Sequence, residues 1–577
     1  MARLAIAQGF LAEYAKLDKD VQGAVDQAIA TFARHPRPGL HLETPQHSQD
    51  DRIRIMPVDG RWRGVVLAPA PGAATDTYCL VTVLPQDKAD AYATSHRFSV
   101  NRALGADAQI QPEELQLILA HPFAAWRTFL HPSQREIAYR TRYAGPAQVT
   151  GGPGTGKTVT VLHRAAFLAE RAAPAEHVLV TTFAGNLADA LAAQLDLLIR
   201  DSQVRQKIEV LNVDRLAYRI VKQARGTPVI ADERTLRTRW AKAAASKGLT
   251  FTPAFGKNEW EQVILAQDLR TEQAYLTCAR TGRGRPLTKA QRSQVWQAAQ
   301  QVTAELAATS QSTHLQLADE AAHLLRQSKT AHYRHILVDE AQDLHPSQWR
   351  LLRAAVAPGP DDLFIAADPH QRVYDNRVSL ASLRISVRGR SRRLSLNYRT
   401  TQEILAWAVL VLGADPVVGL DDEVDSLLGY RSPMRGQRPQ LEAAATRAAE
   451  FAGLARRIRS WLMTGIEPPA VGVAARSARL VREAREALKA DGIMTAPLRG
   501  RGDPQAVRVG TMHAMKGLEF QAVAVIGVEE GLVPEPAAIT PEGEDAITHA
   551  QDLQRERCVL FAACTRARDH LFVSGTG

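Results

Sequence analysis

A glycine-rich run, GGPGTGKTVTV, occupies residues 151–161 and separates a short apolar β-type segment from the helical pattern VLHRAAFLAERAA. The order strand, loop, helix lets backbone N–H groups turn toward an anion, and the new helix points its positive end at the same charge. Lys157 is placed to reach the outer phosphates of a nucleotide, and Thr158 to offer its hydroxyl to Mg²⁺. The run predicts a nucleoside triphosphate site formed by Gly151, Gly152, Pro153, Gly154, Thr155, Gly156, Lys157 and Thr158.

From residue 145 onward, apolar β-type runs alternate with helical patterns, as expected for a parallel sheet. The predicted strands are AQVT, HVLVTTF, IEVLNV, HILVDE, LFIAAD, VGVAAR, VRVGTM and AVAVIGV. Residues near 220–330 are rich in helical patterns and poor in strand patterns. They predict an all-helical insertion between two strands of the first sheet.

Residues 1–100 predict a small α+β unit. Leu4 to Arg34 carries apolar residues at helical spacing and ends at the breaker cluster HPRPG. Three short strands follow, DRIRIMPV, RWRGVVLA and TYCLVTVLP. Residues 101–131 predict a helical connector to the rest of the chain.

The run HILVDEAQD at residues 335–343 predicts a buried strand that ends in two acids. At the tip of such a strand Asp339 can hold Mg²⁺, directly or through water, and Glu340 can polarise the attacking water. The alternative is that the two acids only cap a helix. The phosphate loop upstream favours the metal and the water.

Composition and charge limit the classes of protein that remain. The 577 residues suffice for about three or four domains, and no apolar run approaches the roughly eighteen residues that span a bilayer. The N-terminus has no signal-peptide pattern, and the four scattered cysteines favour a reducing cytoplasm. The net charge is +10, and the basic runs at 279–292 and 384–393 either contact nucleic acid or form solvated faces.

DEAQD together with GGPGTGKT resembles the superfamily 1 helicases of the UvrD/Rep type, and further motifs follow in that family's order over residues 115–577. The resemblance implies an α/β fold with two RecA-like P-loop domains that bind ATP and Mg²⁺ at their boundary. The catalytic residues that it implies are Lys157, Glu340, Gln371, Arg399 and Arg566, the last as an arginine finger. The other nucleotide contacts that it implies are Gln134 and Tyr398 at the adenine, and Glu519.

The same resemblance implies contacts with single-stranded nucleic acid from Thr182, Phe183, Tyr374, Thr511 and His513. Aromatic side chains suit a protein that does not read sequence, because every base offers a π-face for stacking. A role in the hydrophobic core is the alternative for Phe183 and Tyr374, and a satisfied core histidine for His513.

Three departures from the family stand out. Asn376 occupies a position where these helicases usually have tryptophan, and the stretch between VGVAARSAR and VRVGTMH is too short for their large second helical domain. Residues 1–100 resemble RelE/ParE-type toxin domains instead. Their arginines either contact RNA or a partner's acids or lie on a solvated face; they are Arg52, Arg54, Arg61 and Arg63. An accessory or docking module is the interpretation we carry forward.

The predicted function is an ATP-dependent DNA helicase or translocase that moves 3′ to 5′ on single-stranded DNA in repair, recombination or defence. RNA is left open as a substrate. The alternatives are a nucleic-acid-activated ATPase switch without processive unwinding, and a toxin-like protein that acts on RNA. The expected domains are an accessory domain at 1–100, the connector at 101–131, a first RecA-like domain at 132–220 and 317–390, a helical insertion at 221–316, and a second RecA-like domain at 391–577.

Overall fold

The computed structural model describes residues 3–6, 10, 14, 17–34, 42–45, 48, 51–69, 77–95, 130–328, 331–373, 378–413, 417–425, 427, 430–498, 503 and 505–577. Two compact units make up the chain: residues 1–137 with 433–435, and residues 138–432 with 436–577. The predicted connector at 101–131 lies outside the described residues except for its last two.

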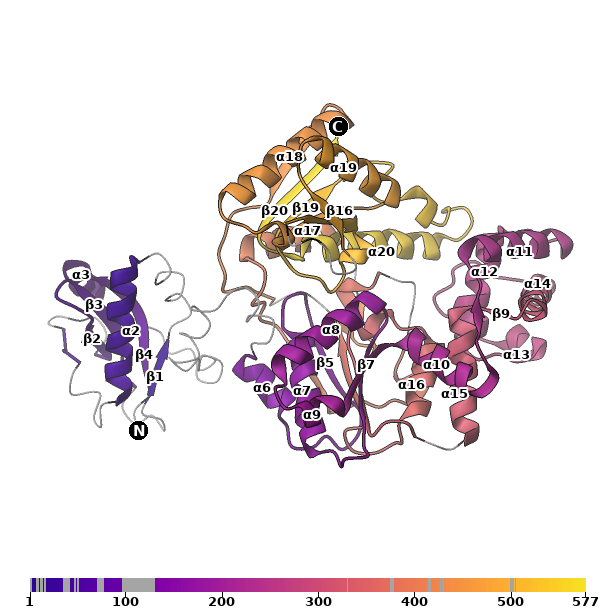
Figure 1. Ribbon diagram of the computed structural model, residues 1–577, viewed down its shortest axis with the longest axis horizontal. Helices are drawn as coiled ribbons and strands as arrows, with labels where there is room; N and C mark the ends of the chain where they lie inside the picture. Colours follow the sequence, from indigo (N-terminus) through magenta and orange to yellow (C-terminus); the bar gives the residue numbers. More distant parts are fainter. Residues whose placement is uncertain are drawn as a thin grey trace. The chain divides into compact units, whose positions relative to one another are not determined.

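The smaller unit is a four-stranded sheet with a helix on each face (Figure 1). The strand order is β1-β4-β3-β2, with β1 parallel to β4 and the other pairs antiparallel. Its elements are β1 (Arg3–Ile6), α2 (Lys19–Arg34), β2 (Ile53–Pro57), β3 (Trp62–Leu67), β4 (Thr77–Pro85) and α3 (Gln86–Ser95). All three predicted strands are present.

The prediction of a helix from Leu4 was wrong at its start. Residues 3–6 form β1, which pairs with residues 77–80 of β4, and the long helix begins only at Lys19. The apolar spacing of RLAI fits either structure, and the exposed edge of β4 decides between them by offering backbone partners. Arg54 and Arg63 donate to backbone carbonyls nearby, those of Asp51 and Asp59.

The first sheet of the larger unit has six parallel strands in the order β12-β5-β11-β10-β6-β7. Their bounds are β5 (Ala147–Gly151), β6 (Val178–Thr182), β7 (Ile208–Asn212), β10 (His335–Val338), β11 (Leu363–Ala367) and β12 (Ser391–Leu394). The sheet is accompanied by α7 (Lys157–Arg171), α8 (Gly185–Leu198), α9 (Ser202–Gln206), α10 (Val213–Arg225), α15 (His314–Ser328) and α16 (Pro346–Ala355). Helices α10, α15 and α16 pack with Ile336, Val338 and Ile365 in one core.

The strand β12 moves the expected C-terminal boundary of the first RecA-like domain. It pairs with β5, so the first sheet extends to Leu394, whereas the sequence placed the end of this domain at residue 390. The strand carries Arg392 and Arg393 on an exposed sheet edge, and it therefore lacks the apolar run by which the other strands were predicted.

A helical insertion follows α10 and has a hydrophobic core of its own, built around Trp240, Trp260, Tyr275 and Trp296. Its helices are α11 (Glu233–Ser246), α12 (Pro253–Glu259), the π-helix η3 (Trp260–Leu265), α13 (Glu272–Thr277) and α14 (Lys289–Ala308). The short strands β8 (Val229–Ile230) and β9 (Gln311–Ser312) pair where the insertion begins and ends.

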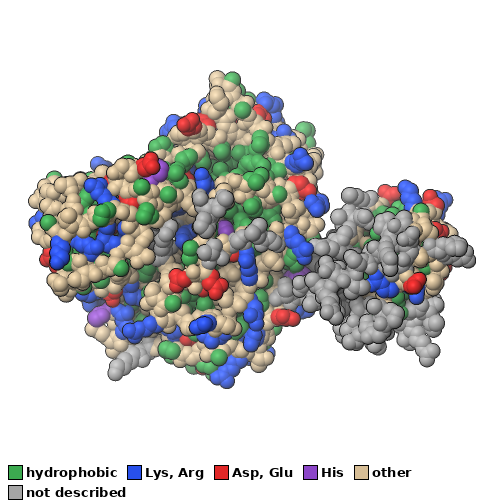
Figure 2. Space-filling view, turned by 180° about the vertical axis from the view of Figure 1, so that it is seen from behind, with side chains coloured by type: hydrophobic (Ala, Val, Ile, Leu, Met, Phe, Trp, Pro, Cys, Tyr) green, Lys and Arg blue, Asp and Glu red, His purple; other side chains and the backbone are tan. Residues whose placement is uncertain are grey.

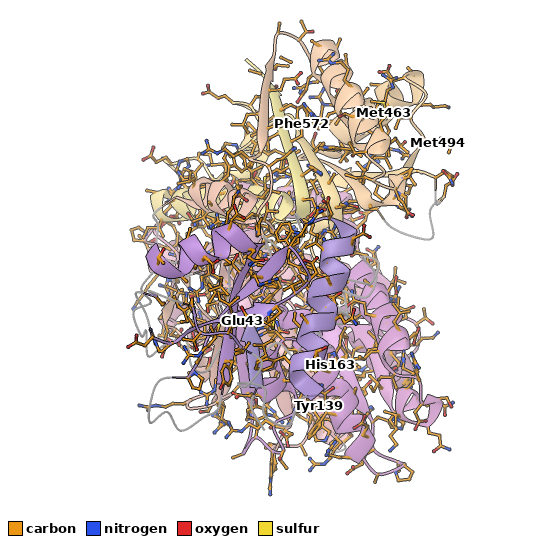
Figure 3. The ribbon with its side chains drawn as sticks, turned by 90° about the vertical axis from the view of Figure 1, so that its left-hand side faces the viewer. Glu43, Tyr139, His163, Met463, Met494 and Phe572 are labelled. Carbon is orange, nitrogen blue, oxygen red and sulfur yellow. The ribbon has the colours of Figure 1, made fainter. Side chains whose placement is uncertain are left out.

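The second sheet is also six-stranded and parallel, in the order β15-β20-β19-β16-β18-β17. Its strands are β15 (Gln440–Ala444), β16 (Val471–Ala475), β17 (Thr495–Pro497), β18 (Val507–Thr511), β19 (Phe520–Ile526) and β20 (Ala567–Thr576). Its helices are α17 (Gln402–Leu412), α18 (Arg447–Met463), α19 (Ala478–Ala490) and α20 (Ala546–Cys564). Figure 3 shows Phe572 of β20 within the sheet, whereas Met463 and Met494 lie at the periphery and are 82% and 53% exposed.

Two parallel sheets of RecA-like type confirm the predicted α/β fold class, and every strand predicted from the apolar runs is present. Between β16 and β18, the described residues contain α19 and β17 alone as regular elements. Among the helices that the structure describes, none combines the length and apolar character that a membrane crossing requires.

Candidate nucleotide and nucleic-acid site

The phosphate loop runs from the end of β5 to the start of α7, as the sequence predicts. Gly154 and Gly156 have φ angles of 69° and 79°, and this left-handed backbone explains why glycine stands at both positions. A Cβ on Gly154 would lie 2.3 Å from Oδ1 of Asn397. That same Oδ1 accepts hydrogen bonds from the backbone N–H groups of Arg399 and Thr400. The segment that carries Arg399 therefore packs directly on the loop.

Lys157 is buried beneath the loop. Its ammonium group donates to the carbonyls of Gly151 and Gly152, at 2.9 and 2.8 Å, and lies 3.2 Å from Oδ2 of Asp368. Asp368 follows β11 and is completely buried. The Lys157 ammonium group is thus held beneath the loop by one carboxylate and two backbone carbonyls.

Thr158 and Asp339 form the candidate magnesium site. The Thr158 hydroxyl donates to Oδ2 of Asp339 at 2.9 Å, so the two residues meet although they are far apart in the sequence. Burial, followed by the charge of neighbouring Glu340, raises the pKa of Asp339 to about 6. A hydroxyl and a carboxylate are hard oxygen ligands, and Mg²⁺ is usually bound by one or two protein groups together with phosphates and water. The donor set therefore fits Mg²⁺.

Glu340 occupies a strained position at the tip of β10, with φ 54° in the left-handed region. Its carboxylate accepts a hydrogen bond from the Gln342 side chain at 2.6 Å. Burial raises the pKa of Glu340, but the positive charges around it, first that of Lys516, outweigh burial and lower the pKa to about 2. The side chain is therefore held as a carboxylate, the form that can accept a proton.

The second sheet contributes two arginines to the same region. The Arg566 guanidinium is 2% exposed and donates to Oε1 of Gln371, which follows β11, at 2.6 Å. Burial, and then the charge of Arg399, lowers the pKa of Arg566 from its usual value. Arg399 forms an ion pair with Glu519. The structure therefore brings Gln371 and Arg566 together, and Arg399 and Glu519 together.

The adenine candidates are placed separately. Tyr398 lies beside the loop, and its backbone N–H donates to the Gly154 carbonyl at 3.0 Å. Gln134 lies on α6 (Pro132–Ala138), is 2% exposed, and accepts a hydrogen bond from the backbone N–H of His131 through its side-chain oxygen.

Sequence reasoning missed Lys516, which follows β18. Its ammonium group is 1% exposed, pairs with Asp343, donates to the Gln371 carbonyl at 2.5 Å and lies 3.6 Å from Glu340. One buried cation of the second sheet thus joins three residues of the first. The sequence carried a weak signal for it, a lysine inside the quoted run VRVGTMHAMKGLEF.

A cavity of about 570 Å³ lies next to this network and includes Phe183 among its lining residues. Phe183 is partly buried, and the Lys516 ammonium lies 5.4 Å from the centre of its ring. The other lining residues are Ala184, Gly185, Asn212, Asp214, Arg215, Tyr218, His314, Leu315, Asp343, His345 and Gln348. Arginine, histidine and an aromatic ring in one concave surface can hold a phosphate backbone and a base.

Of the other nucleic-acid candidates, those that the structure describes do not line this cavity. Thr182 is completely buried at the end of β6. Thr511 accepts a hydrogen bond from the backbone N–H of Ala514, and burial, followed by the charge of Arg476, lowers the pKa of His513 to about 4. Tyr374 and Asn376 lie outside the described residues.

The basic runs are largely engaged within the protein. Arg280 is bound to Glu259, and Arg292 donates to three backbone carbonyls of the insertion. Arg393 pairs with Asp425, and Arg390 donates to the Pro146 carbonyl. On the face drawn in Figure 2, lysine and arginine side chains of the larger unit are spread over the surface without forming one basic patch.

Comparison with known proteins agrees with this geometry. The family model of the UvrD/REP helicase N-terminal domain matches residues 130–385, and that of the UvrD-like helicase C-terminal domain matches residues 497–576. The chain is 26% identical to the ATP-dependent DNA helicase UvrD2 of Mycobacterium bovis and Mycobacterium tuberculosis, over 77% of this chain and 78% of UvrD2. A shorter match, to the ATP-dependent DNA helicase PcrA of Staphylococcus aureus, is 40% identical over 68 residues, which are 12% of this chain and 8% of PcrA.

Proposed function

This chain is a UvrD-like ATP-dependent DNA helicase, and we propose that it moves 3′ to 5′ along single-stranded DNA while it hydrolyses ATP between its two sheets. The observation that carries the proposal is the set of contacts across those sheets. Arg566 and Lys516 of the second sheet both contact Gln371 of the first, close to the acid Glu340. Gln371 is therefore bound to two cations that belong to the other half of the unit.

In the proposed reaction, Lys157, Arg399 and Arg566 bind phosphate oxygens of ATP, with Gln371 near the γ-phosphate. Arginine suits the last two positions because its planar fork binds phosphate oxygens in pairs. Glu340 accepts the proton of the attacking water. Thr158 and Asp339 would hold Mg²⁺, which supplies neutralisation of the phosphate charge when bound. Gln134 and Tyr398 bind the adenine, and Glu519 contacts the nucleotide.

We propose that single-stranded DNA binds in the cavity that includes Phe183. Stacking on an aromatic ring contributes about 1–3 kcal/mol per base without reading sequence. Arg215 and His314 add positive or hydrogen-bonding groups on the same surface. Closing on ATP and opening after hydrolysis would shift Thr511 and His513, on the second sheet, relative to Phe183 on the first.

The test is ATPase activity with single-stranded DNA, duplex DNA and RNA, followed by unwinding of duplexes with 3′ or 5′ tails. We expect stimulation by single-stranded DNA and unwinding from a 3′ tail only. Lys157→Ala and Glu340→Gln are expected to abolish turnover. ATP turnover that ignores nucleic acid of every kind would contradict the proposal, and unwinding from a 5′ tail would reverse the polarity.

A DNA-activated ATPase switch without processive unwinding is the second candidate. The observation that favours it is the short connection between β16 and β18, which in the described residues holds only α19 and β17. Translocation and strand displacement measured side by side distinguish the two candidates. Movement along single strands without displacement of duplex would select a motor that does not unwind, and robust unwinding by the monomer would reject the switch.

We further propose that residues 1–100 are a RelE/ParE-like accessory or docking module, and that the motor serves DNA repair, recombination or defence. The four-stranded sheet with a helix on each face supports this module. RNA cleavage by the full chain that persists in the Lys157→Ala variant would instead favour a toxin-like activity. Loss of function in cells without loss of DNA-stimulated ATPase, after deletion of the module, would support docking.

A further inference from the structure

The helical insertion contacts the domain of the second sheet at the N-terminal end of α20. Asp545, which is 3% exposed, accepts hydrogen bonds from the backbone N–H groups of Gly284 and Arg285, both at 3.1 Å. The same carboxylate caps α20 by accepting from the N–H of Thr548 at 3.0 Å. The buried Asp545 carboxylate therefore caps α20 and also binds a loop about 260 residues earlier in the chain.

Two side-chain contacts flank this acid. The Thr252 hydroxyl donates to Glu544 at 2.8 Å, and the Gln551 side chain donates to the Gly282 carbonyl at 3.0 Å. Gly284 leaves no room for a side chain, since a Cβ there would lie 2.5 Å from Oδ1 of Asp545. It would also lie 2.7 Å from Cβ of Ile547. The surfaces fit closely, and their fit depends on glycine at 284.

Several hydrogen bonds anchor the loop that carries Gly284. Arg280 binds both carboxylate oxygens of Glu259, at 2.5 and 2.8 Å, and also donates to the Arg285 carbonyl. Arg283 donates to the Asn258 carbonyl at 2.9 Å. Glu259 is 1% exposed, so this is a buried and charge-assisted anchor. The arginines Arg280 and Arg283 of the basic run at 279–292 thus bind groups inside the insertion and do not form a solvated face.

The far end of α20 leads to the candidate arginine finger. The helix ends at Cys564, and Arg566 lies two positions later, with its Nε donating to the Ala562 carbonyl of the last turn. A 19-residue α-helix moves largely as a rigid body about 28 Å long, because successive turns are joined by backbone hydrogen bonds. The position of Asp545 therefore influences the position of the Arg566 guanidinium against Gln371.

A second segment of the insertion, η3, contacts a residue that lines the cavity. The His345 ring bonds through Nε2 to the Glu261 carbonyl of η3, at 3.0 Å, and His345 lines the cavity. Arg350 donates to the carbonyls of Leu265 and Ala266, at 2.7 and 2.8 Å. The insertion is thus bound both to a residue that lines the cavity and to the N-terminal end of α20.

We propose that the helical insertion is a strut through which Asp545 positions Arg566, so that single-stranded DNA in the cavity raises the rate of ATP hydrolysis. Asp545 is a positioning residue here, since it acts through α20 and does not line the cavity. The inference rests on the proposed function, because it assigns the route by which the DNA site and the ATP site are coupled. Such coupling amounts to about 5-fold or more in typical cases.

The test compares Gly284→Ala with Gly543→Ala in the full chain. The added methyl at 284 meets Asp545 and Ile547, whereas at Gly543 no described atom lies within 4 Å of the Cβ position. Neither Gly284 nor Gly543 has a left-handed backbone, so neither alanine is forced into that strained conformation. Asp545→Asn is the second variant, because asparagine caps a helix as well as aspartate but removes the charge that binds the loop. ATPase is measured without DNA and with saturating oligothymidylate, and DNA affinity is measured separately.

We expect Gly284→Ala and Asp545→Asn each to reduce the DNA-stimulated kcat by about 5-fold or more, with basal ATPase, the KM for ATP and DNA affinity unchanged. Gly543→Ala should behave as the parent, and the double variant should lose no more than either single one. Full stimulation in Gly284→Ala would overturn the inference. A loss that disappears at saturating DNA would also overturn it, since the loop would then bind DNA. If DNA does not stimulate the ATPase of the parent protein, that result refutes the proposed function instead.

Discussion

Lys516 is a buried cation of the second sheet that pairs with acids of the first, and replacing it tests how the two halves are held. Its side chain is 1% exposed, that of its partner Asp343 is 0% and that of Glu340 is 9%. Lys516→Met keeps the length of the side chain and removes its charge. Two buried carboxylates then lose their common cation.

The expected cost follows from that burial. Breaking a buried ion pair by removing one partner costs about 3–5 kcal/mol, because the remaining charge is left in a medium that solvates it poorly. The Coulomb attraction of Glu340 alone, for charges about 4 Å apart at an effective dielectric constant of about 20, is about 4 kcal/mol before desolvation is subtracted. We therefore expect Lys516→Met to lower the free energy of unfolding of the larger unit by about 3–5 kcal/mol.

Urea unfolding followed by tryptophan fluorescence measures this loss, since Trp349 and Trp461 are buried in the cores of the first and second sheets. The double variant Lys516→Met with Asp343→Asn is the control, because it removes the cation together with one of the two carboxylates that the cation pairs with. It should recover at least half of the lost stability. A loss below about 1 kcal/mol, or a double variant as unstable as the single one, would refute the reasoning.

Three further predictions concern single residues. Arg566→Lys should lower kcat for ATP by about 10³-fold or more while the KM changes little, in steady-state assays; a loss confined to KM would contradict an arginine finger. Gly154→Ala should weaken ATP binding at least about tenfold in a fluorescent-nucleotide titration, because a left-handed alanine costs about 1–2 kcal/mol and its Cβ meets Asn397. Burial lowers the pKa of His345 to about 3, so the unfolded chain binds the extra proton and stability falls as the pH drops from 6.5 toward 3. His345→Asn should reduce the slope of unfolding free energy against pH by about 1.4 kcal/mol per unit, and an unchanged slope would show that His345 is not the group.

The phosphate loop and the acids of β10 were predictable because their chemistry is local. Glycines with left-handed backbone, the following lysine and threonine, and a strand that ends in two acids each occupy a few consecutive residues. The strands were predictable for the same reason, since a strand buried in a parallel sheet is a continuous apolar run. The edge strands β1, β12, β15 and β17 were not predicted, because a sheet edge accepts residues without a continuous apolar run. The inner strand β20 was also missed.

Contacts between distant residues could not be predicted in this way. The sequence places Asp339 and Thr158 in one site only through the order of motifs, whereas the structure gives the 2.9 Å hydrogen bond that joins them. Lys516 and Asp343 lie 173 positions apart, and Asp545 and Arg285 lie 260 apart. Nothing in the neighbouring residues of either pair marks its partner.

The sequence by itself therefore determined that this chain binds and hydrolyses a nucleoside triphosphate in a parallel-sheet fold, because a phosphate cradle is made by one short stretch of backbone and its flanking helix. The tertiary structure alone decided how that site is connected. It buried Lys516 between two acids of the opposite sheet and placed Asp545 against the loop of a helical insertion. Burial and close approach are properties of the packed chain, and they set the charges and the mechanical links through which ATP and DNA can act on each other.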